Sequence, residues 1–335
     1  MDGTFLNEQI GAGIHQIDAS QYHGDPCPEP SLSSTVAKVL IAQTPLHAWT
    51  ISPRLNPEWE PINKKTFDIG RAAHRAVLGV GDDYEAIPES LLASNGAAST
   101  KAAKEFIEDC RARGVTPLKA EEVGQIRMIA DRVRARLDAM GIVIDPQRSE
   151  VTALSVVDGI WCRCMVDNAP IDQSLPLYDL KTTAGSVHPD ALARTVADYG
   201  YDVQAAHYLR TWKEATGEDR KFRFIFVEKT PPFEVGVIEL YDDGLSRPAS
   251  DYASDEPLSG DWFADAEQKL SRARKQWRAC LDSGVWPGYP PRVALIGAPI
   301  WHRRNSASAQ DFDPILPKSK PSADALAAAA KFQAP

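Results

Sequence analysis

The stretch from Ser149 to Thr183 constrains the fold more than any other part of the chain. Its segments "SEVTALSVV", "IWCRCMVD" and "LPLYDLKTT" are rich in β-branched and apolar residues. The turn residues Asp158-Gly159 and a polar loop from Asn168 to Pro176 separate these segments, as expected of strands that follow one another in a sheet. The pattern therefore predicts a three-stranded meander near the middle of the chain.

The segments on either side of the meander have mostly helical patterns. Two further runs, "KFRFIFVEK" and "EVGVIELY", flank a Pro-Pro turn and are predicted to be strands. A meander, a crossing helix and two more strands describe one α/β domain in which helices pack around a central mixed β-sheet. The expected helices cover residues 31–40, 64–78, two segments between 99 and 140 separated at "GVTPLKA", 189–216 and 260–283, and residues 81–98 are expected to be a loop with a short helix.

We expect a single domain over residues 1–304, because no linker divides this part of the chain. Residues 305–335 are rich in Ala, Ser and Pro. Such a segment has too few apolar side chains to form a core of its own, so we predict a disordered tail.

The composition is typical of a globular protein of the cytosol. Hydrophobic residues make up 43% of the 335, and no apolar run approaches the length of a membrane span. The N-terminus lacks the pattern of a signal peptide. Five scattered cysteines are expected to be reduced thiols, and the spacing of Cys162 and Cys164 is too short for a zinc or iron–sulfur site.

The net charge of −9 argues against a general affinity for polyanions. Nucleic-acid binding would have to depend on local basic clusters, although a run of charges is more often a solvated helix face. The candidates are Lys64, Lys65 and Arg71, then Arg272, Arg274, Lys275 and Arg278 in "RARKQWR", and His302 to Arg304.

The segment "YDLKTT" places Asp179 and Lys181 two residues apart on one predicted strand. Side chains of a strand alternate between faces, so these two project from the same side. Taken alone, such a pattern is more often an exposed strand with a weak charge pair. The preceding strand ends in Asp167, however, and the loop that follows brings Asp179 and Lys181 back beside it. Glu150, at the start of the first strand of the meander, would add a third acid at the same corner.

Several carboxylates in one partly desolvated corner repel one another unless a cation lies between them. Oxygen ligands of this type suit Mg²⁺ or Mn²⁺, which retain waters and bind substrate phosphates. Lys181 would then orient or help deprotonate an attacking water, or neutralise the transition state of phosphate displacement. The residues alone therefore favour a metal-dependent phosphodiesterase.

Two helical segments add polar residues whose role the pattern alone leaves open. Gln204 and Tyr208 in "YDVQAAHY" lie on one helix face, and "GRAAHRA" contributes His74. Each of these side chains, taken by itself, is more often structural than functional.

The order of "GRAAH", "EVTAL", "CRCMVD", "YDLKTT" and "YDVQAAHY" resembles that of the PD-(D/E)XK nucleases. Within them it resembles the RecE-type exonuclease domain, a relative of the RecB nuclease domain and of lambda exonuclease. The segments "SLSSTVAKVLIAQTPLHAW" and "CLDSGVWPGYPP" are also similar to this phage-associated group, so the resemblance extends from about Gly13 to Trp301.

The resemblance implies a role for each candidate residue and a restriction-endonuclease-like core. His74, Asp167, Asp179 and the carbonyl of Leu180 would bind the metal, and Lys181 would be the catalytic lysine. Glu150 matches the acid on the preceding strand. Gln204 and Tyr208 match a QxxxY element that lies near the scissile phosphate and the DNA end. The acid before the lysine is Asp179, where many members of the superfamily have Glu.

We therefore expect an exonuclease that degrades double-stranded DNA from its ends, 5′ to 3′, in phage-type recombination, in the cytoplasm of a bacterium or of a phage-infected cell. Expected partners are DNA ends, a single-strand annealing protein and further copies of this chain, because members of the family often form rings. Two alternatives stay open: a non-catalytic module that binds DNA ends with the same fold, and a metal-dependent endonuclease or RNase.

Overall fold

The computed structural model describes residues 9–60, 68–242 and 261–299. The chain divides into two compact units, residues 1–289 and 290–335, and every helix and strand named below lies in the first. The described part of the second unit, residues 290–299, contains neither helix nor strand. The predicted domain boundary after residue 304 and the predicted tail lie outside the described residues.

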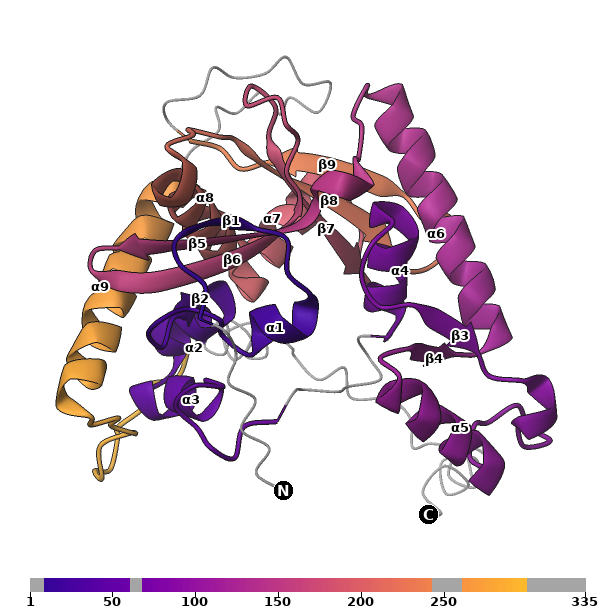
Figure 1. The fold of residues 1–335 in the computed structure, drawn as a ribbon, viewed down its shortest axis with the longest axis horizontal. Coiled ribbons are helices and arrows are strands. Elements are labelled where there is room, and N and C mark those ends of the chain that lie inside the picture. The colour runs from indigo at the N-terminus through magenta and orange to yellow at the C-terminus, as the bar shows by residue number, and fades with distance from the viewer. Residues whose placement is uncertain (1–8, 61–67, 243–260, 300–335) are drawn as a thin grey trace, which may run out of the picture. The chain divides into compact units, whose positions relative to one another are not determined.

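A mixed seven-stranded sheet forms the centre of the first unit (Figure 1). The three predicted strands of the meander are present as β5, β6 and β7, and the two later strands as β8 and β9. Neighbours in the sheet are antiparallel except for the parallel pairs β7–β8 and β2–β6. The order is β1 (Gly13–His15), β5 (Ser149–Val157), β6 (Ile160–Asn168), β7 (Leu177–Thr183), β8 (Phe222–Glu228) and β9 (Val235–Glu239), while β2 (Leu32–Ser33) pairs with β6 beside this path. The predicted fold class, α/β with a mixed sheet, is confirmed.

A parallel pair needs a crossover connection, and two helices supply it between β7 and β8. These are α7 (Pro189–Tyr199) and α8 (Tyr201–Thr216). The sequence predicted one continuous helix here, which is wrong. Gly200 adopts φ 62° and ψ 42°, a left-handed conformation that ends α7 and redirects the chain into α8.

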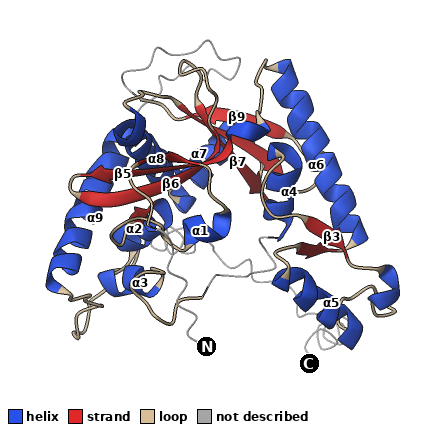
Figure 2. Cartoon of the chain, in the orientation of Figure 1, coloured by secondary structure: helices blue, strands red, loops and turns tan. Residues whose placement is uncertain are grey.

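Helices cover the sheet on both faces (Figure 2). Along β7, Leu177 faces the cluster that includes α7 and α8, while Tyr178 and Leu180 face the one that includes α4 (Asp68–Leu78) and α6 (Ala120–Ala139). Both helices were predicted, although residues 61–67 at the expected start of α4 lie outside the described part. The alternation of one strand between two apolar clusters fixes which face each polar side chain of β7 occupies.

A third apolar cluster joins the N-terminal helices to the C-terminal one. It contains α2 (Ser34–Ala42), which packs beside α3 (Pro45–Thr50), α8 and α9 (Trp262–Ser283). The Ser33 hydroxyl caps α2 by accepting from the N–H of Val36 at 3.3 Å. This cluster ties α2 to the same helix, α8, that covers β7.

The remaining elements are short. The parallel strands β3 (Tyr84–Ala86) and β4 (Thr116–Leu118) form a separate two-stranded sheet where the sequence predicted only a loop and a helix break. Three-residue strands carry too little periodicity to be recognised. The other short elements are α1 (Ala19–His23), α5 (Lys101–Ala112) and the 3-10 turns Glu89–Leu91 and Pro146–Arg148. Within the described ranges, every helix is too short or too polar to cross a membrane.

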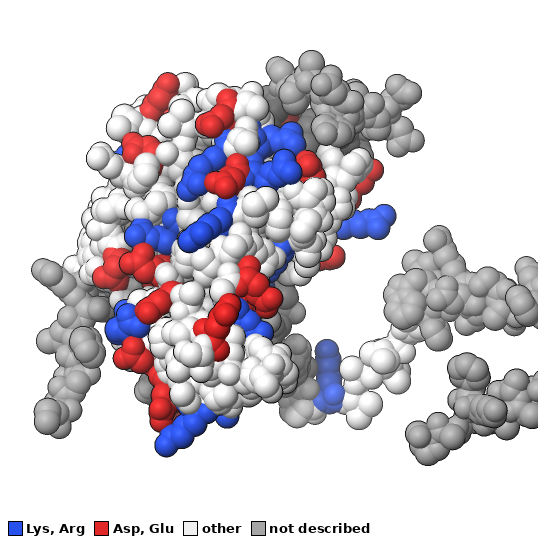
Figure 3. All heavy atoms as spheres, turned by 90° about the vertical axis from the view of Figure 1, so that its right-hand side faces the viewer, with Lys and Arg blue, Asp and Glu red and all other residues white. Residues whose placement is uncertain are grey.

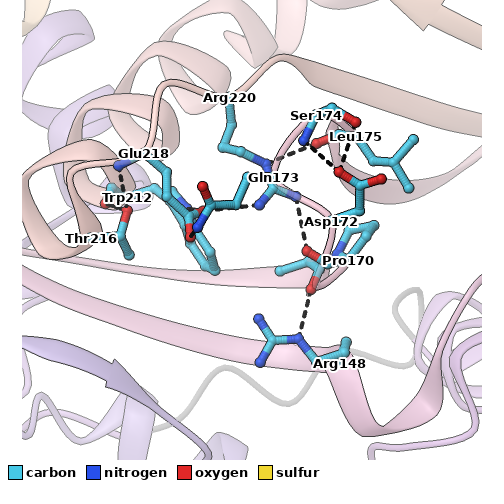
Figure 4. A network of polar contacts seen from close by, with 11 residues as sticks. Arg148, Pro170, Asp172, Gln173, Ser174, Leu175, Trp212, Thr216, Glu218 and Arg220 are labelled. Carbon is cyan, nitrogen blue, oxygen red and sulfur yellow. Dashed lines mark hydrogen bonds and ion pairs between the residues drawn. The ribbon is translucent and has the colours of Figure 1, made fainter.

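The loop between β6 and β7 is held by a buried arginine (Figure 4). Arg220 donates to the carbonyl of Leu175 at 2.8 Å and to that of Pro170 at 3.0 Å, and it pairs with Glu218 at 2.9 Å. The indole of Trp212 donates to the same carboxylate at 2.9 Å. The loop that sets β7 beside β6 is therefore anchored to the end of α8.

Candidate active site

Three acids occupy the same level of three adjacent strands. Ser149 pairs with Asn168 and Val151 with Val166, so Glu150 of β5 and Asp167 of β6 face one another between these pairs. Asn168 also pairs with Tyr178, the residue before Asp179. The structure therefore brings Glu150, Asp167 and Asp179 to one corner of the sheet.

Asp179 is almost completely buried, with 1% of its surface exposed. Its Oδ1 forms an ion pair with the ammonium of Lys181, and its Oδ2 accepts from the Gln204 amide at 2.8 Å. Burial raises the pKa of this carboxyl to about 6, Lys181 opposes the shift, and the nearby charge of Asp167 adds to it. An exposed strand with a weak charge pair does not describe this environment.

Lys181 follows Asp179 on the same face of β7 and approaches an aromatic ring of α8. Its ammonium lies 5.4 Å from the centre of the Tyr201 ring, within the range of a cation–π interaction. Burial lowers the pKa of Lys181, but the carboxylates of Asp179 and Asp167 outweigh burial and leave it above its ordinary value. Lys181 is therefore an ammonium ion held between two acids and a π face.

Asp167 replaces part of the backbone ladder where β6 and β7 diverge. Its Oδ2 accepts from the N–H of Leu180 at 2.6 Å and lies 3.6 Å from Nδ1 of His74. The other nitrogen of that imidazole, Nε2, lies 2.8 Å from the carbonyl oxygen of Leu180. His74 of α4, Asp167 and the Leu180 carbonyl therefore meet in one group.

Glu150 completes the corner from β5 in an unusual backbone conformation. Its φ is 51°, in the left-handed region that L side chains rarely adopt. Burial raises its pKa, and the charge of Asp167 raises it further while His74 lowers it. Its carboxylate lies against Gly81, where an added Cβ would be 2.8 Å from Oε1.

The two residues of the predicted QxxxY element differ in their surroundings. Gln204 holds Asp179, as described above. Tyr208 is 8% exposed and packs edge to face on Phe222, with 5.9 Å between ring centres. The structure thus gives Tyr208 a place in the apolar core, and its predicted role beside the scissile phosphate stays a prediction.

The donor set of this corner fits a divalent cation in its chemistry. Asp167, Asp179 and Glu150 offer carboxylate oxygens, Leu180 a carbonyl and His74 an imidazole, which together suit Mg²⁺ or Mn²⁺. Burial raises the pKa of Asp179 and of Glu150, and the charge of Asp167 adds to both shifts, so a bound cation would favour the charged forms of these acids. Among the described residues, no three acidic, His or Cys side chains converge at ligand distance. Lys181 and Gln204 engage the two oxygens of Asp179.

Two further residues lie beside this corner and escaped the sequence analysis. The ammonium of Lys38, on α2, is 5.6 Å from the centre of the Tyr201 ring and donates to the carbonyl of Tyr199 at 3.3 Å. Tyr199 stacks on Tyr201 with 5.7 Å between ring centres and is 65% exposed. Lys38 comes from a distant element, so strand periodicity around "YDLKTT" carried no signal for it.

Where the structure describes them, the predicted basic residues lie in mixed surroundings. Arg274 is buried and pairs with Asp158 and Glu267, whereas Lys275 is exposed. Lys64, Lys65 and His302 to Arg304 lie outside the described residues. On the face in Figure 3, the side of α6, basic side chains gather in the upper part with acidic ones among them. This face offers mixed charge rather than one sign.

Comparison with known proteins identifies the family. A family model described as "PDDEXK-like domain of unknown function" matches residues 43–255. Among solved structures, the chain is similar to a crystal structure from Eubacterium rectale described as "Putative exonuclease", with a TM-score of 0.55, 15% sequence identity, and coverage of 85% of this chain and 97% of that one. At this identity the similarity shows the fold alone. A search of the curated proteins finds no match. The family model covers more than half of the chain, and the chain therefore belongs to the PDDEXK-like domains of the PD-(D/E)XK nuclease superfamily.

Proposed function

We propose that the protein is a metal-dependent deoxyribonuclease that digests double-stranded DNA from its ends, 5′ to 3′. The observation that carries the proposal is a buried aspartate, Asp179, paired with Lys181 at the level of Asp167 and Glu150. Membership of a PD-(D/E)XK family and a structural neighbour described as an exonuclease support the reaction class. The RecE-like order of the sequence motifs supports the choice of DNA ends and a role in recombination.

Each residue of the corner has a task in phosphodiester hydrolysis. Asp167 and Asp179, with the Leu180 carbonyl and His74, would hold Mg²⁺ or Mn²⁺. When bound, such an ion supplies positive charge that lowers the pKa of a water and stabilises charge on the phosphate. The Lys181 ammonium donates hydrogen bonds to the attacking water or to a phosphate oxygen. Gln204 fixes the rotamer of Asp179, and Glu150 adds charge that favours the cation.

The test is an assay with end-labelled linear duplex DNA in Mg²⁺ or Mn²⁺. We expect the wild type to digest the duplex, and Asp179→Asn and Lys181→Met each to lower the rate by on the order of 10²-fold or more. Asp219→Asn serves as a control, because the Asp219 side chain is 83% exposed and its ion pair among the described residues is with Lys213, away from the corner. Digestion at the wild-type rate by either site variant would refute the assignment.

The same assay separates the alternatives. Cleavage of circular DNA would indicate an endonuclease, cleavage of RNA a ribonuclease, and labels at the two ends report polarity. A DNA-end-binding module that has lost catalysis would not need the complete set of Asp167, Asp179 and Lys181 that the chain retains. Assembly into a homo-oligomer and docking of an annealing protein remain proposals that rest on the resemblance.

A further inference from the structure

The junction of α7 and α8 presents a cation and an aromatic ring beside the catalytic corner. We define the junction patch as Lys38, Tyr199 and Tyr201. The ammonium groups of Lys38 and Lys181 lie 5.6 Å and 5.4 Å from the centre of one ring, that of Tyr201. The Tyr201 ring therefore lies next to both Lys38 and the proposed catalytic lysine.

Packing and a hydrogen bond to the backbone hold Lys38 in place. Its stem lies against the junction, where an added Cβ at Gly200 would be 3.0 Å from its Cδ, and its ammonium donates to the Tyr199 carbonyl at 3.3 Å. Among the described residues, no carboxylate forms an ion pair with Lys38. The nearby Asp202 is engaged with Lys269 at 3.4 Å.

The electrostatics of the patch favour an anion. Burial and, after it, the positive charge of Lys181 lower the pKa of Lys38 to about 8, while Asp179 and Asp202 oppose the shift. Lys181 has its own ion pair with Asp179, whereas Lys38 has none among the described residues, so the positive charge of Lys38 is the less compensated of the two. A phosphate oxygen beside Lys38 would compensate this charge and form a charge-assisted hydrogen bond with the ammonium.

Tyr199 adds a surface for a base. Its ring is 65% exposed, stacks on Tyr201 with an interplanar angle of 16°, and thus has a fixed orientation although it contributes little to the core. Tyr201 is itself packed on Phe224 and Phe226 at 5.5 and 5.8 Å between centres. A rigid, exposed ring beside a lysine is the combination by which proteins bind single nucleic-acid strands.

We propose that the junction patch is a nucleotide-binding subsite next to the cleavage site, in which Lys38 binds a backbone phosphate and Tyr199 stacks on a base of the same strand. The proposal rests on the proposed nuclease function and names a contact that holds the strand while its neighbouring phosphate lies at Lys181. It also gives a reason for the position of α2, which carries Lys38 to the junction.

The test is binding of a short fluorescein-labelled DNA strand, measured by anisotropy with Ca²⁺ in place of Mg²⁺ at several salt concentrations. We expect Lys38→Gln to weaken binding roughly tenfold, as for loss of one charge-assisted hydrogen bond, and to reduce the salt slope by about 0.7. Tyr199→Leu is expected to weaken binding roughly tenfold with an unchanged salt slope, since stacking carries no charge. Lys38→Arg and Tyr199→Phe should restore most of the affinity.

A purely structural lysine would leave the salt slope unchanged, which makes the slope the decisive measurement. Lys213→Gln, an exposed lysine on α8 that pairs with Asp219, is the matched control and should bind as the wild type does. If Lys38→Gln keeps the wild-type affinity and slope, the subsite is refuted, whether or not the wild type cleaves DNA. If binding depends on Lys38 but no divalent ion supports cleavage of any nucleic acid, the subsite stands and the nuclease function is refuted. Absence of binding by the wild type refutes the subsite, whereas the nuclease function is decided by the duplex digestion assay.

Discussion

The environment of Asp179 distinguishes it from the other acids of the chain. In the sequence it is one of 46 acids. In the structure it is 1% exposed with a pKa raised to about 6 by burial. A charge in such a place costs several kcal/mol of stability unless partners offset it. Lys181 and Gln204 offset part of that cost, which is the arrangement expected of a functional carboxylate.

Gly81 offers a test of Glu150 that leaves the carboxylate in place. We expect Gly81→Ala to lower the free energy of unfolding by about 1–2 kcal/mol, because the φ of Gly81 is 98°. We also expect it to lower the cleavage rate, because the new Cβ would lie only 2.8 Å from Oε1 of Glu150 and would displace that carboxylate. Gly114→Ala is the matched control: its φ is 70°, and nothing lies within 4 Å of an added Cβ. Urea unfolding and initial cleavage rates measure the two effects. Equal loss of activity in both variants would contradict a role for Glu150 in the site.

The residues of the corner differ in how far the sequence pattern predicts their positions. Glu150, Asp167, Asp179 and Lys181 lie at strand positions, and a period of two residues predicts their faces and their common level. His74 required the resemblance, because a helix periodicity does not say which strand the helix covers. Lys38 and Tyr199 meet across 161 residues of sequence, and no local pattern encodes such a contact.

The elements of the fold were largely predictable where they are long. The strands of the meander, β8, β9 and helices such as α6 follow from periodicity and turn residues. The break between α7 and α8 was missed because a single glycine inside a helical pattern is usually tolerated. Here the left-handed conformation of Gly200 allows α7 and α8 to take different directions and places Tyr199 and Tyr201 at the break.

The packing of α8 on β6 buries a histidine, His207, and makes stability depend on pH. His207 is 1% exposed, its Nε2–H donates to the Arg163 carbonyl at 3.1 Å, and burial lowers its pKa to about 4. The unfolded chain takes up this proton near pH 6.5 but the folded protein does so only near 4. Stability from this group is therefore present above pH 6.5 and is lost as the pH falls from 6.5 to 4.

We expect the free energy of unfolding to fall between pH 7 and pH 5 by about 2 kcal/mol more in the wild type than in His207→Gln. The difference between variants is the informative quantity, because the raised pKa of Asp179 acts in the opposite direction over part of this range. Urea titrations at both pH values measure it, with the exposed His188→Gln as control. Identical pH dependence in wild type and His207→Gln would contradict the assignment.

The molecule as a whole is negatively charged, whereas two lysines, Lys181 and Lys38, lie at the candidate site. A net charge of −9 repels DNA at long range, so the proposed affinity for DNA would have to come from short-range contacts, for which we propose Lys181 and Lys38. The same net charge attracts any divalent cation weakly, which means that a stabilising effect of Mg²⁺ alone would not identify a site. A specific site is distinguished by its dependence on particular carboxylates.

Removal of divalent ions provides that distinction. We expect Mg²⁺ or Mn²⁺ at a hundredfold excess over its dissociation constant to stabilise the wild type by about 2.7 kcal/mol relative to chelator, and so to raise its Tm by a few degrees. Asp179→Asn should lose this increase, because the amide replaces a charged ligand, while Asp219→Asn should keep it although both changes reduce the net negative charge equally. Thermal unfolding with and without chelator measures all three proteins. A Tm increase of the same size in both variants would assign the effect to the general charge of the molecule. No Tm increase in the wild type would mean that the corner does not bind the ion before DNA is present.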